Sequence, residues 1–482
     1  MSESAIYALV LVLYMGLLIA VGVMTSRRMR SSADFYAGGR SIGPWVTSLS
    51  YVAAYFSSVV IIGGGGFGYR YGMATIWIAA ANVLVGCTLA WIVLGKRVRR
   101  FTARLGALTI PGFFAERYRS KEARILSAVV IALFLIVYNV SILKGMGHAF
   151  EVLMGMPYMV SVLLSGAIII LYVSLGGYLA VVWTGFFQAW VMGVGLILLT
   201  VAALHAVGGL TVANIRLASI DAGLVETPGV WGWAGLVSFA LITSLGVWGM
   251  PQMLARFVSM RDVRVLRVGT VVVTIGGAMA VLPYINGAIA RVLHPGLASA
   301  DLAIPTLTKA VLSPWCGAIF LAGVVAAGMS SFSAILLTTS SAVVRDVLQK
   351  GYGRDLSERQ AIRHSRVVSV VVGVISLGIA LRPPALVLVL MAFASATIAS
   401  TCLWPLLFGL YWRRTTRWGV LASMVSGLLA SLVWMSVGSP LGLHGFIPGI
   451  VVSLIAIVVV SLMTKRLPDD HLARVWDGNG TA

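Results

Sequence analysis

Residues 178–204 read YLAVVWTGFFQAWVMGVGLILLTVAAL, a run of 27 residues without a charged side chain. A helix of this length is long enough to cross the ~30 Å hydrocarbon core of a bilayer. Apolar stretches of 18 or more residues recur along the whole sequence. In lipid every backbone polar group must be bonded within its own segment, and these stretches are apolar on all sides, which excludes open sheets and alternating barrel strands. The pattern predicts an all-α polytopic membrane protein.

The overall composition supports this prediction. Hydrophobic residues make up 59% of the 482 positions, charged residues make up 10%, and the mean hydropathy is +0.98. A soluble domain carries roughly 25% charged residues, so the surface of this protein cannot face mainly water. Breaks between the apolar runs predict thirteen transmembrane helices, at about 5–24, 42–68, 75–95, 125–153, 157–175, 178–207, 231–254, 268–291, 314–344, 367–381, 385–411, 419–437 and 446–464.

The net charge of +20 follows the predicted topology. Alternate loops and the C-terminal tail hold 29 of the 35 Lys and Arg residues. The positive-inside bias makes that side cytoplasmic, with the N-terminus outside and the tail 465–482 inside, in the cell (inner) membrane. Because the charge is explained by topology, no nucleic-acid partner is expected. The partners expected are the lipid bilayer, a coupling ion and a small-molecule solute.

The order of the helices indicates an inverted repeat within a single transporter domain, 1–482. Helices two to six (42–207) begin on the inside, whereas helices seven to eleven (231–411) begin on the outside. Five helices thus face five of opposite orientation, an arrangement common in secondary transporters. The helix at 5–24 and the two helices at 419–464 are expected to be peripheral.

The acidic residues limit the energy source. All fifteen Asp and Glu lie in loops, tails or helix ends, with Glu151 expected to be the deepest. No Walker-type phosphate loop is present, and no acid sits at mid-membrane to act as a proton relay. A driving cation must then be held by neutral oxygens, which suits Na+. No organic cofactor is expected, and the absence of a His, Asp and Glu cluster within the helices argues against an enzyme.

The second predicted helix contains the first candidate site. It reads SYVAAYFSSVVII over 50–62, followed by the glycines of 63–66. Each glycine costs ~1 kcal/mol of helix propensity relative to alanine, so four in succession predict a weak or broken helix. A broken helix exposes backbone groups to ions and solutes, although glycines also allow close helix packing. The candidate solute-binding residues are Tyr55, Ser57, Ser58, Gly63 and Gly64.

The ninth predicted helix contains the second candidate site. It reads AAGMSSFSA over 326–334 and TTSS over 338–341. Ser330 and Ser331 follow a small-residue turn and can supply two hydroxyl ligands to a hard cation. Small hydroxyl residues also serve as contacts between membrane helices, so both interpretations stay open.

The ninth helix through Arg345-Asp346 resembles the signature helix of the sodium/solute symporter family. DFYAGGR over 34–40 resembles the start of that family's second helix. LGGYLAVVWT over 175–184 and GMPQ over 249–252, with Arg256-Phe257, resemble two further motifs in the expected order. The likeness spans about 5–465. AIPTL over 303–307 and LWPLLFGLYW over 403–412 make the pattern closest to pantothenate permease-like and monocarboxylate permease-like members.

The resemblance implies a five-plus-five inverted-repeat fold, as in amino-acid/sodium symporters, and a sodium site between helices two and nine. Its ligands here would be the carbonyls of Ala53, Phe56 and Ala327 and the hydroxyls of Ser330 and Ser331. Two positions depart from the family pattern. Gly185 stands where many members have Asp, and Ala334 stands where members with a second sodium site have a hydroxyl, so a second site is predicted to be absent.

Lys144, about twenty residues into the fourth helix, has three interpretations. A mid-helix lysine is costly in lipid unless it faces a cavity or a partner. Its ammonium can neutralise the carboxylate of a solute, extend to the outer interface or pair with Glu151, or replace a cation and weaken sodium dependence.

The sequence thus predicts a sodium-coupled symporter that imports a small organic solute by alternating access. A monocarboxylate or a pantothenate-like carboxylate is the first candidate. The alternatives are a sodium-independent or proton-coupled carrier on the same scaffold, and a carrier of a neutral solute such as a sugar or of an amino acid such as proline. A membrane sensor is less favoured because no signalling domain is appended. The sequence makes no prediction of the oligomeric state.

Overall fold

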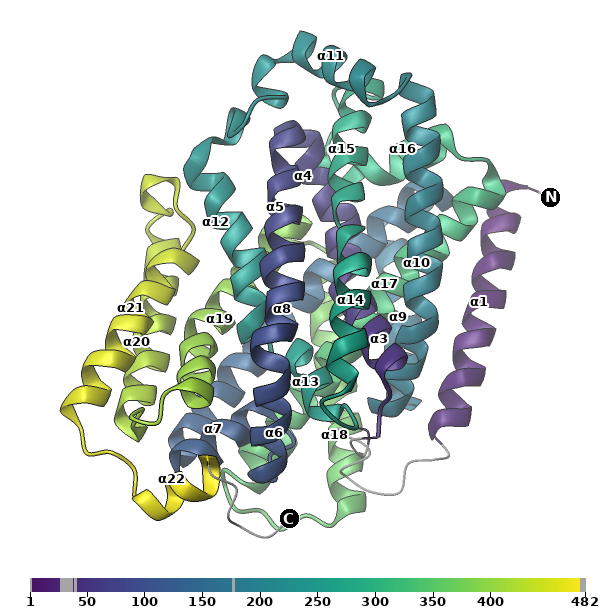
Figure 1. Cartoon of the computed structure of the whole chain (residues 1–482). Coiled ribbons are helices and arrows are strands. Elements are labelled where there is room, and N and C mark those ends of the chain that lie inside the picture. Colours follow the sequence, from purple (N-terminus) through teal and green to yellow (C-terminus); the bar gives the residue numbers. More distant parts are fainter. Residues whose placement is uncertain (1, 27–37, 39–40, 176–177, 477–482) are drawn as a thin grey trace.

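The computed structural model describes residues 2–26, 38, 41–175 and 178–476, and these form a helical bundle (Figure 1). By length and composition, eleven helical runs among them can cross a membrane. The 46-residue run Val59–Arg104 contains two predicted passages, which are separated at Gly72, a residue with a φ of +72°. Each of the thirteen predicted segments coincides with helical structure. Parts of two family motifs, 34–37 with 39–40 and 176–177, lie outside the described residues.

The first predicted repeat contains the following helices. They are α3 (Pro44–Tyr55), η2 (Val59–Gly63), α4 (Gly64–Tyr71), α5 (Ile76–Ala81), η4 (Asn82–Leu89), η5 (Trp91–Gly95), α6 (Lys96–Arg104), α7 (Ile110–Tyr118), α8 (Lys121–Met154), α9 (Tyr158–Leu175) and α10 (Tyr178–Val207). The helix α1 (Glu3–Ser26) precedes them and packs against α10 and α17. The boundaries of the repeat remain a prediction.

The second predicted repeat also consists of helices. It comprises α12 (Gly232–Ser244), η8 (Leu245–Gly249), α13 (Pro251–Ser259), α14 (Val265–Ala278), α15 (Val281–Leu293), η9 (Ala300–Leu302), α16 (Ala303–Val311), α17 (Pro314–Ser341), η10 (Ala342–Gln349), α18 (Glu358–Ala380) and α19 (Val387–Tyr411). The helices α20 (Arg417–Ser436), α21 (Phe446–Met463) and α22 (Asp469–Trp476) follow. The helices α6, α7 and α22 lie at one end of the bundle, and α11 (Leu210–Ile220) lies at the other (Figure 1).

The first helix of each predicted repeat is interrupted. The helix α3 stops at Tyr55, and the chain resumes as a helix at Val59. In the other repeat α12 ends at Ser244, Met250 is extended with a ψ of 112°, and α13 begins at Pro251. Matching interruptions at the start of both repeats agree with the inverted-repeat topology.

The break in the second predicted helix lies before the glycines and not at them. Gly63 ends η2, and the next three glycines begin α4. These glycines allow α4 and α15 to pack closely. A Cβ at Gly287 would lie 1.8 Å from Gly65 O, and one at Gly68 would lie 2.0 Å from Tyr284 O. The predicted helix break at 63–66 was therefore misplaced, and the packing interpretation accounts for the glycines.

The helices α17 and α19 form the centre of the bundle. In the most apolar stretch of α17, 94% of the residues are buried, and in that of α19, 83% are buried. The corresponding share is 28% in α1, α18 and α21. The last three therefore present most of their surface outward, as expected for helices at the lipid boundary. The α17 sequence is rich in Ala, Gly and Ser, which lets several helices approach it closely.

The close contact between α4 and α15 gives a test of the packing. Gly287→Ala would place a methyl group in steric overlap with the Gly65 carbonyl oxygen and force the two helices apart. We expect this to lower the free energy of unfolding by roughly 1–3 kcal/mol. We expect a clearly lower melting temperature for the purified protein. Gly378→Ala is the matched control, because nothing lies within 4 Å of a Cβ there. Equal melting temperatures for the two variants would contradict the packing described.

Candidate functional site

The end of α3 leaves backbone carbonyls free for other partners. Phe56 N–H still donates to Val52 O at 2.8 Å, but Ser57 N–H turns back to Tyr55 O at 3.0 Å. Phe56 itself has φ −79° and ψ 73°, which is not helical. The carbonyls of the last α3 turn are consequently available to ligands or side chains, in a segment that is fully buried.

Two serine hydroxyls of α17 occupy those carbonyls. Ser330 Oγ donates to Ala53 O at 2.7 Å and lies 2.9 Å from Ala327 O. Ser331 Oγ donates to Ala54 O at 2.8 Å. Both serines are at most 3% exposed. The two helices that the sequence singled out therefore meet at the predicted residues.

The predicted ligand set is brought together in part. Ala53, Ala327 and Ser330 share direct contacts, whereas the hydroxyl of Ser331 bonds to Ala54 and not to a predicted carbonyl. The Phe56 carbonyl is not an acceptor of either serine. Ala54 was missed because the carbonyl ligands were carried over from the family motif, which implied Ala53 and Phe56 in this segment. The oxygens present are all neutral, and unwound backbone carbonyls of this kind hold Na+ in membrane transporters, so the group fits a sodium ion.

The two positions that depart from the family pattern supply no ligand oxygen. Gly185 packs against Ser50, whose Cβ would lie 3.1 Å from a Cβ placed on the glycine. Ala334 is buried within α17. The prediction that a second sodium site is absent stays a prediction.

A cavity adjoins the break in α3. Its lining includes Ala54, Tyr55 and Val60 from the broken helix. No lining residue is charged. The polar groups come from six further elements: Asn82, Tyr138, Thr243, Gln252, Tyr284 and Ser395. Three methionines, Met250, Met253 and Met391, supply a polarizable apolar surface.

Two buried amides of the cavity have unused acceptor capacity. Asn82 Oδ1 and Gln252 Oε1 make no hydrogen bond to any described residue, and both residues are buried, with only about 5% of their surface exposed. A Cβ at Gly86 would lie 2.6 Å from Asn82 Oδ1, so this glycine leaves the space that the amide occupies. A buried amide without a partner costs free energy unless a ligand or water satisfies it. The cavity can therefore accept hydrogen bonds from a solute.

Of the solute-binding residues predicted in the second helix, Tyr55 lines the cavity. Ser58 instead donates to Ile142 O at 2.9 Å, and Gly63 and Gly64 pack against Leu388 and the Tyr284 ring, which do line it. Ser57 is fully buried at the break itself.

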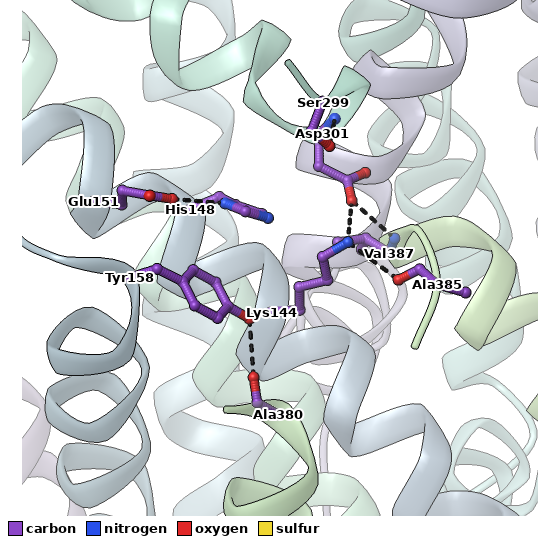
Figure 2. Close-up of polar contacts among 9 residues, drawn as sticks. All are labelled: Lys144, His148, Glu151, Tyr158, Ser299, Asp301, Ala380, Ala385 and Val387. Atoms are coloured by element: carbon purple, nitrogen blue, oxygen red, sulfur yellow. Dashed lines mark hydrogen bonds and ion pairs between the residues drawn. The ribbon is translucent and has the colours of Figure 1, made fainter. Parts of the chain in front are cut away.

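Lys144 forms an ion pair that the sequence did not predict. Its Nζ lies 2.6 Å from Asp301 Oδ2 and 3.1 Å from Ala385 O (Figure 2). The two charged side chains are 9% and 2% exposed. The ammonium thus has a partner without any solute, and it is not part of the cavity lining.

Two related expectations are corrected. Lys144 does not pair with Glu151, whose Oε2 instead lies 2.8 Å from His148 Nδ1 (Figure 2). Glu151 is not the most buried acid, because Asp301 and Asp346 are each only 1% exposed. Asp301 lies in a loop in the sequence, but the loop folds inward as η9 and buries it.

Comparison with known proteins identifies the family. The sequence model of the sodium:solute symporter family matches residues 35–427. An osmoregulated proline transporter of Bacillus subtilis is 30% identical over 467 residues, which are 94% of each chain. A sodium/proline symporter of Escherichia coli is 32% identical over 475 residues, which are 93% of this chain and 91% of the relative.

Solved structures share the fold at low sequence identity. A Na+-coupled sialic acid symporter, solved substrate-bound and outward-open, aligns with a TM-score of 0.82 at 18% identity, over 96% of this chain and 98% of that chain. A nucleobase-cation-symport-1 family transporter aligns with a TM-score of 0.57 at 15% identity, over 91% and 97%. The predicted inverted-repeat fold is confirmed.

The predicted sodium coupling is confirmed by the same family. The finer prediction of a monocarboxylate or pantothenate-like substrate is not confirmed, because the relatives described above are proline transporters. This chain is a multi-pass, sodium-coupled symporter that belongs to the sodium:solute symporter family.

Proposed function

We propose that the protein imports a small solute without net charge, an amino acid or imino acid of about the size of proline. The observation that carries the proposal is the cavity lining, which holds no charged side chain but has two unpaired amide oxygens. These acceptors suit the ammonium of a zwitterion. The proline transporters among the relatives support this class of solute.

The carboxylate of such a solute has a complementary site at the break. The helical run that resumes at Val59 has its N-terminal end at the break, and Val60 lines the cavity. The N–H groups of Val60 and Ile61 donate to Ser57 O, which leaves those of Ser58 and Val59 for a carboxylate. Helix N-termini favour anions, and discontinuous helices of transporters use them in this way. A monocarboxylate, the solute first expected from the sequence, would use the same helix end and leaves the two amide acceptors unpaired. The zwitterion satisfies both.

The sodium ion would be held by oxygens of Ala53, Ala54, Ala327, Ser330 and Ser331. Sodium is a hard cation, and its arrival would replace the present hydroxyl-to-carbonyl hydrogen bonds with coordination of the same oxygens. Ala54 links the ion to the solute, because its carbonyl accepts from Ser331 and the residue also lines the cavity. An ion that fixes the last turn of α3 fixes Tyr55 at the cavity wall as well.

The orientation in the membrane is also a proposal. The basic residues gather at the end of the bundle that carries α6, α7 and α22. By the positive-inside bias this end faces the cytoplasm, with the N-terminus outside, in the cell (inner) membrane.

The class of solute can be tested by thermal shift of the purified protein. We expect proline or a related amino acid to raise the melting temperature in sodium but not in a potassium buffer, because bound ligands stabilise by mass action. Asn82→Leu, which removes one unpaired acceptor, should weaken the shift by an amount equal to roughly a tenfold loss of affinity. Stabilisation by monocarboxylates alone, unaffected by Asn82→Leu, would contradict the zwitterion proposal.

The sodium ligands can be tested by transport. Ser331→Ala should raise the sodium concentration for half-maximal uptake by roughly 5- to 30-fold, because one ligand of an ion is worth ~1–2 kcal/mol. Ser333→Ala is the matched control, since that hydroxyl bonds within α17 to Met329 O. Unchanged sodium dependence in a Ser330→Ala/Ser331→Ala double variant would disprove the assignment.

The number of sodium ions can be tested with the same assay. Gly185 and Ala334 supply no second set of ligands, so the uptake rate should rise hyperbolically with sodium, with a Hill coefficient of about one. A clearly sigmoidal curve would mean that a second sodium ion binds elsewhere.

A further inference from the structure

The Lys144–Asp301 ion pair joins three separate elements. Lys144 projects from α8, Asp301 lies on the η9 turn between α15 and α16, and the third element is the start of α19 (Figure 2). Asp301 Oδ2 accepts from Val387 N–H at 3.1 Å as well as from the ammonium. The ammonium in turn donates to Ala385 O. Each charged group therefore bonds both to the other and to the beginning of α19.

The same turn rests on the half-helix that begins at the cavity. A Cβ at Gly66 of α4 would lie 3.1 Å from Ala300 O and 3.3 Å from Asp301 Oδ1. Gly63, three residues earlier, packs equally closely on the backbone of Leu388, which lines the cavity. From Val60 to Gly66 the helix rises by about 9 Å. The ion pair thus lies between the cavity and the end of the bundle opposite the basic loops.

The η9 turn packs on α4 at Gly66 and follows α15 in the chain, and Asp301 joins it to α8 through the ion pair. The backbones of α4 and α15 meet at Gly65 and Gly287 with no space for a methyl group, and η9 continues the chain from α15. Any opening that moves these elements away from α8 and α19 must separate Lys144 from Asp301. In transporters with inverted repeats, such rigid-body rocking around a fixed site gives alternating access.

The energetics suit a contact that opens and closes. Separating two buried charges in a dry environment is very costly, because each charge is left without a partner. If water enters as the elements part, hydration compensates both groups. The pair is therefore stable either closed and dry or open and wet, with no stable arrangement between.

We propose that Lys144 and Asp301 are gating residues that hold the outer end of the solute pathway closed and separate in each transport cycle. This inference rests on the alternating-access function proposed above, but not on which solute is carried. The nearby His148–Glu151 pair has no such role, because its partners are three residues apart on the same helix α8.

The test measures access to the cavity from outside. Val60→Cys places a reporter thiol in the cavity wall, in a protein whose partly exposed native thiol is removed by Cys316→Ser. Intact cells are treated with a membrane-impermeant maleimide in sodium buffer without solute. The variants compared are Lys144→Met/Asp301→Asn, which removes both charges together, Asp301→Asn alone, and Glu151→Gln as the matched control.

We expect the reporter thiol of the double variant to react roughly tenfold faster than that of the protein with the intact ion pair. A loss of ~1.4 kcal/mol in the free energy that favours the closed state gives a change of this size. Asp301→Asn should label at least as fast, because it leaves the ammonium unpaired, and it serves if the double variant is not recovered in the membrane. Glu151→Gln should label at the parent rate. If both variants that carry Asp301→Asn were labelled at the rate of the parent protein, the ion pair would be purely structural and the proposal would be overturned. No solute is used, so failure of the solute assignment leaves this result unaffected.

Discussion

The structure depends on the requirement that buried backbone groups in a membrane find partners. At the end of α3 the helix stops in the middle of the bundle, and the carbonyls of Ala53 and Ala54 lose their helical donors. The hydroxyls of Ser330 and Ser331 take their place. Such a contact is adequate but replaceable, because a cation can coordinate the same oxygens. The unwound turn thus needs partners for its carbonyls, and it is also the ion site that we propose.

The same unwound turn connects the ion to the solute. Ala54 and Tyr55 line the cavity, while the carbonyls of Ala53 and Ala54 accept hydrogen bonds from the two serines. Sodium and solute therefore bias one element, and each must change the affinity of the other by the same factor. The ion pair of Lys144 on α8 and Asp301 on η9 lies beside Gly66 of the resumed helix and outside the cavity lining, where we propose that it controls access to the cavity.

Much of the fold could be predicted from the sequence, because hydropathy and charge bias act locally. The thirteen apolar segments all coincide with helices, and Ser330 and Ser331, which the sequence singled out and the family resemblance made candidate ligands, do contact the end of α3. The position of the helix break could not be predicted, because Gly63–Gly66 look like helix breakers in the sequence alone. Only the packing of α15 against α4 shows why the glycines are there. Asp301 was also missed as a partner, because a loop residue 157 positions from Lys144 becomes buried only when the loop folds inward. These failures share one cause: the deciding contact is distant in sequence.

Equilibrium binding of radioactive sodium to the purified protein, with and without a solute that stabilises it, tests the proposed ion site most directly. We expect one sodium ion per chain and loss of binding in Ser330→Ala/Ser331→Ala. The solute should raise the sodium affinity by the same factor as sodium raises the solute affinity. Sodium binding of wild-type affinity in that double variant would contradict the proposed ion site.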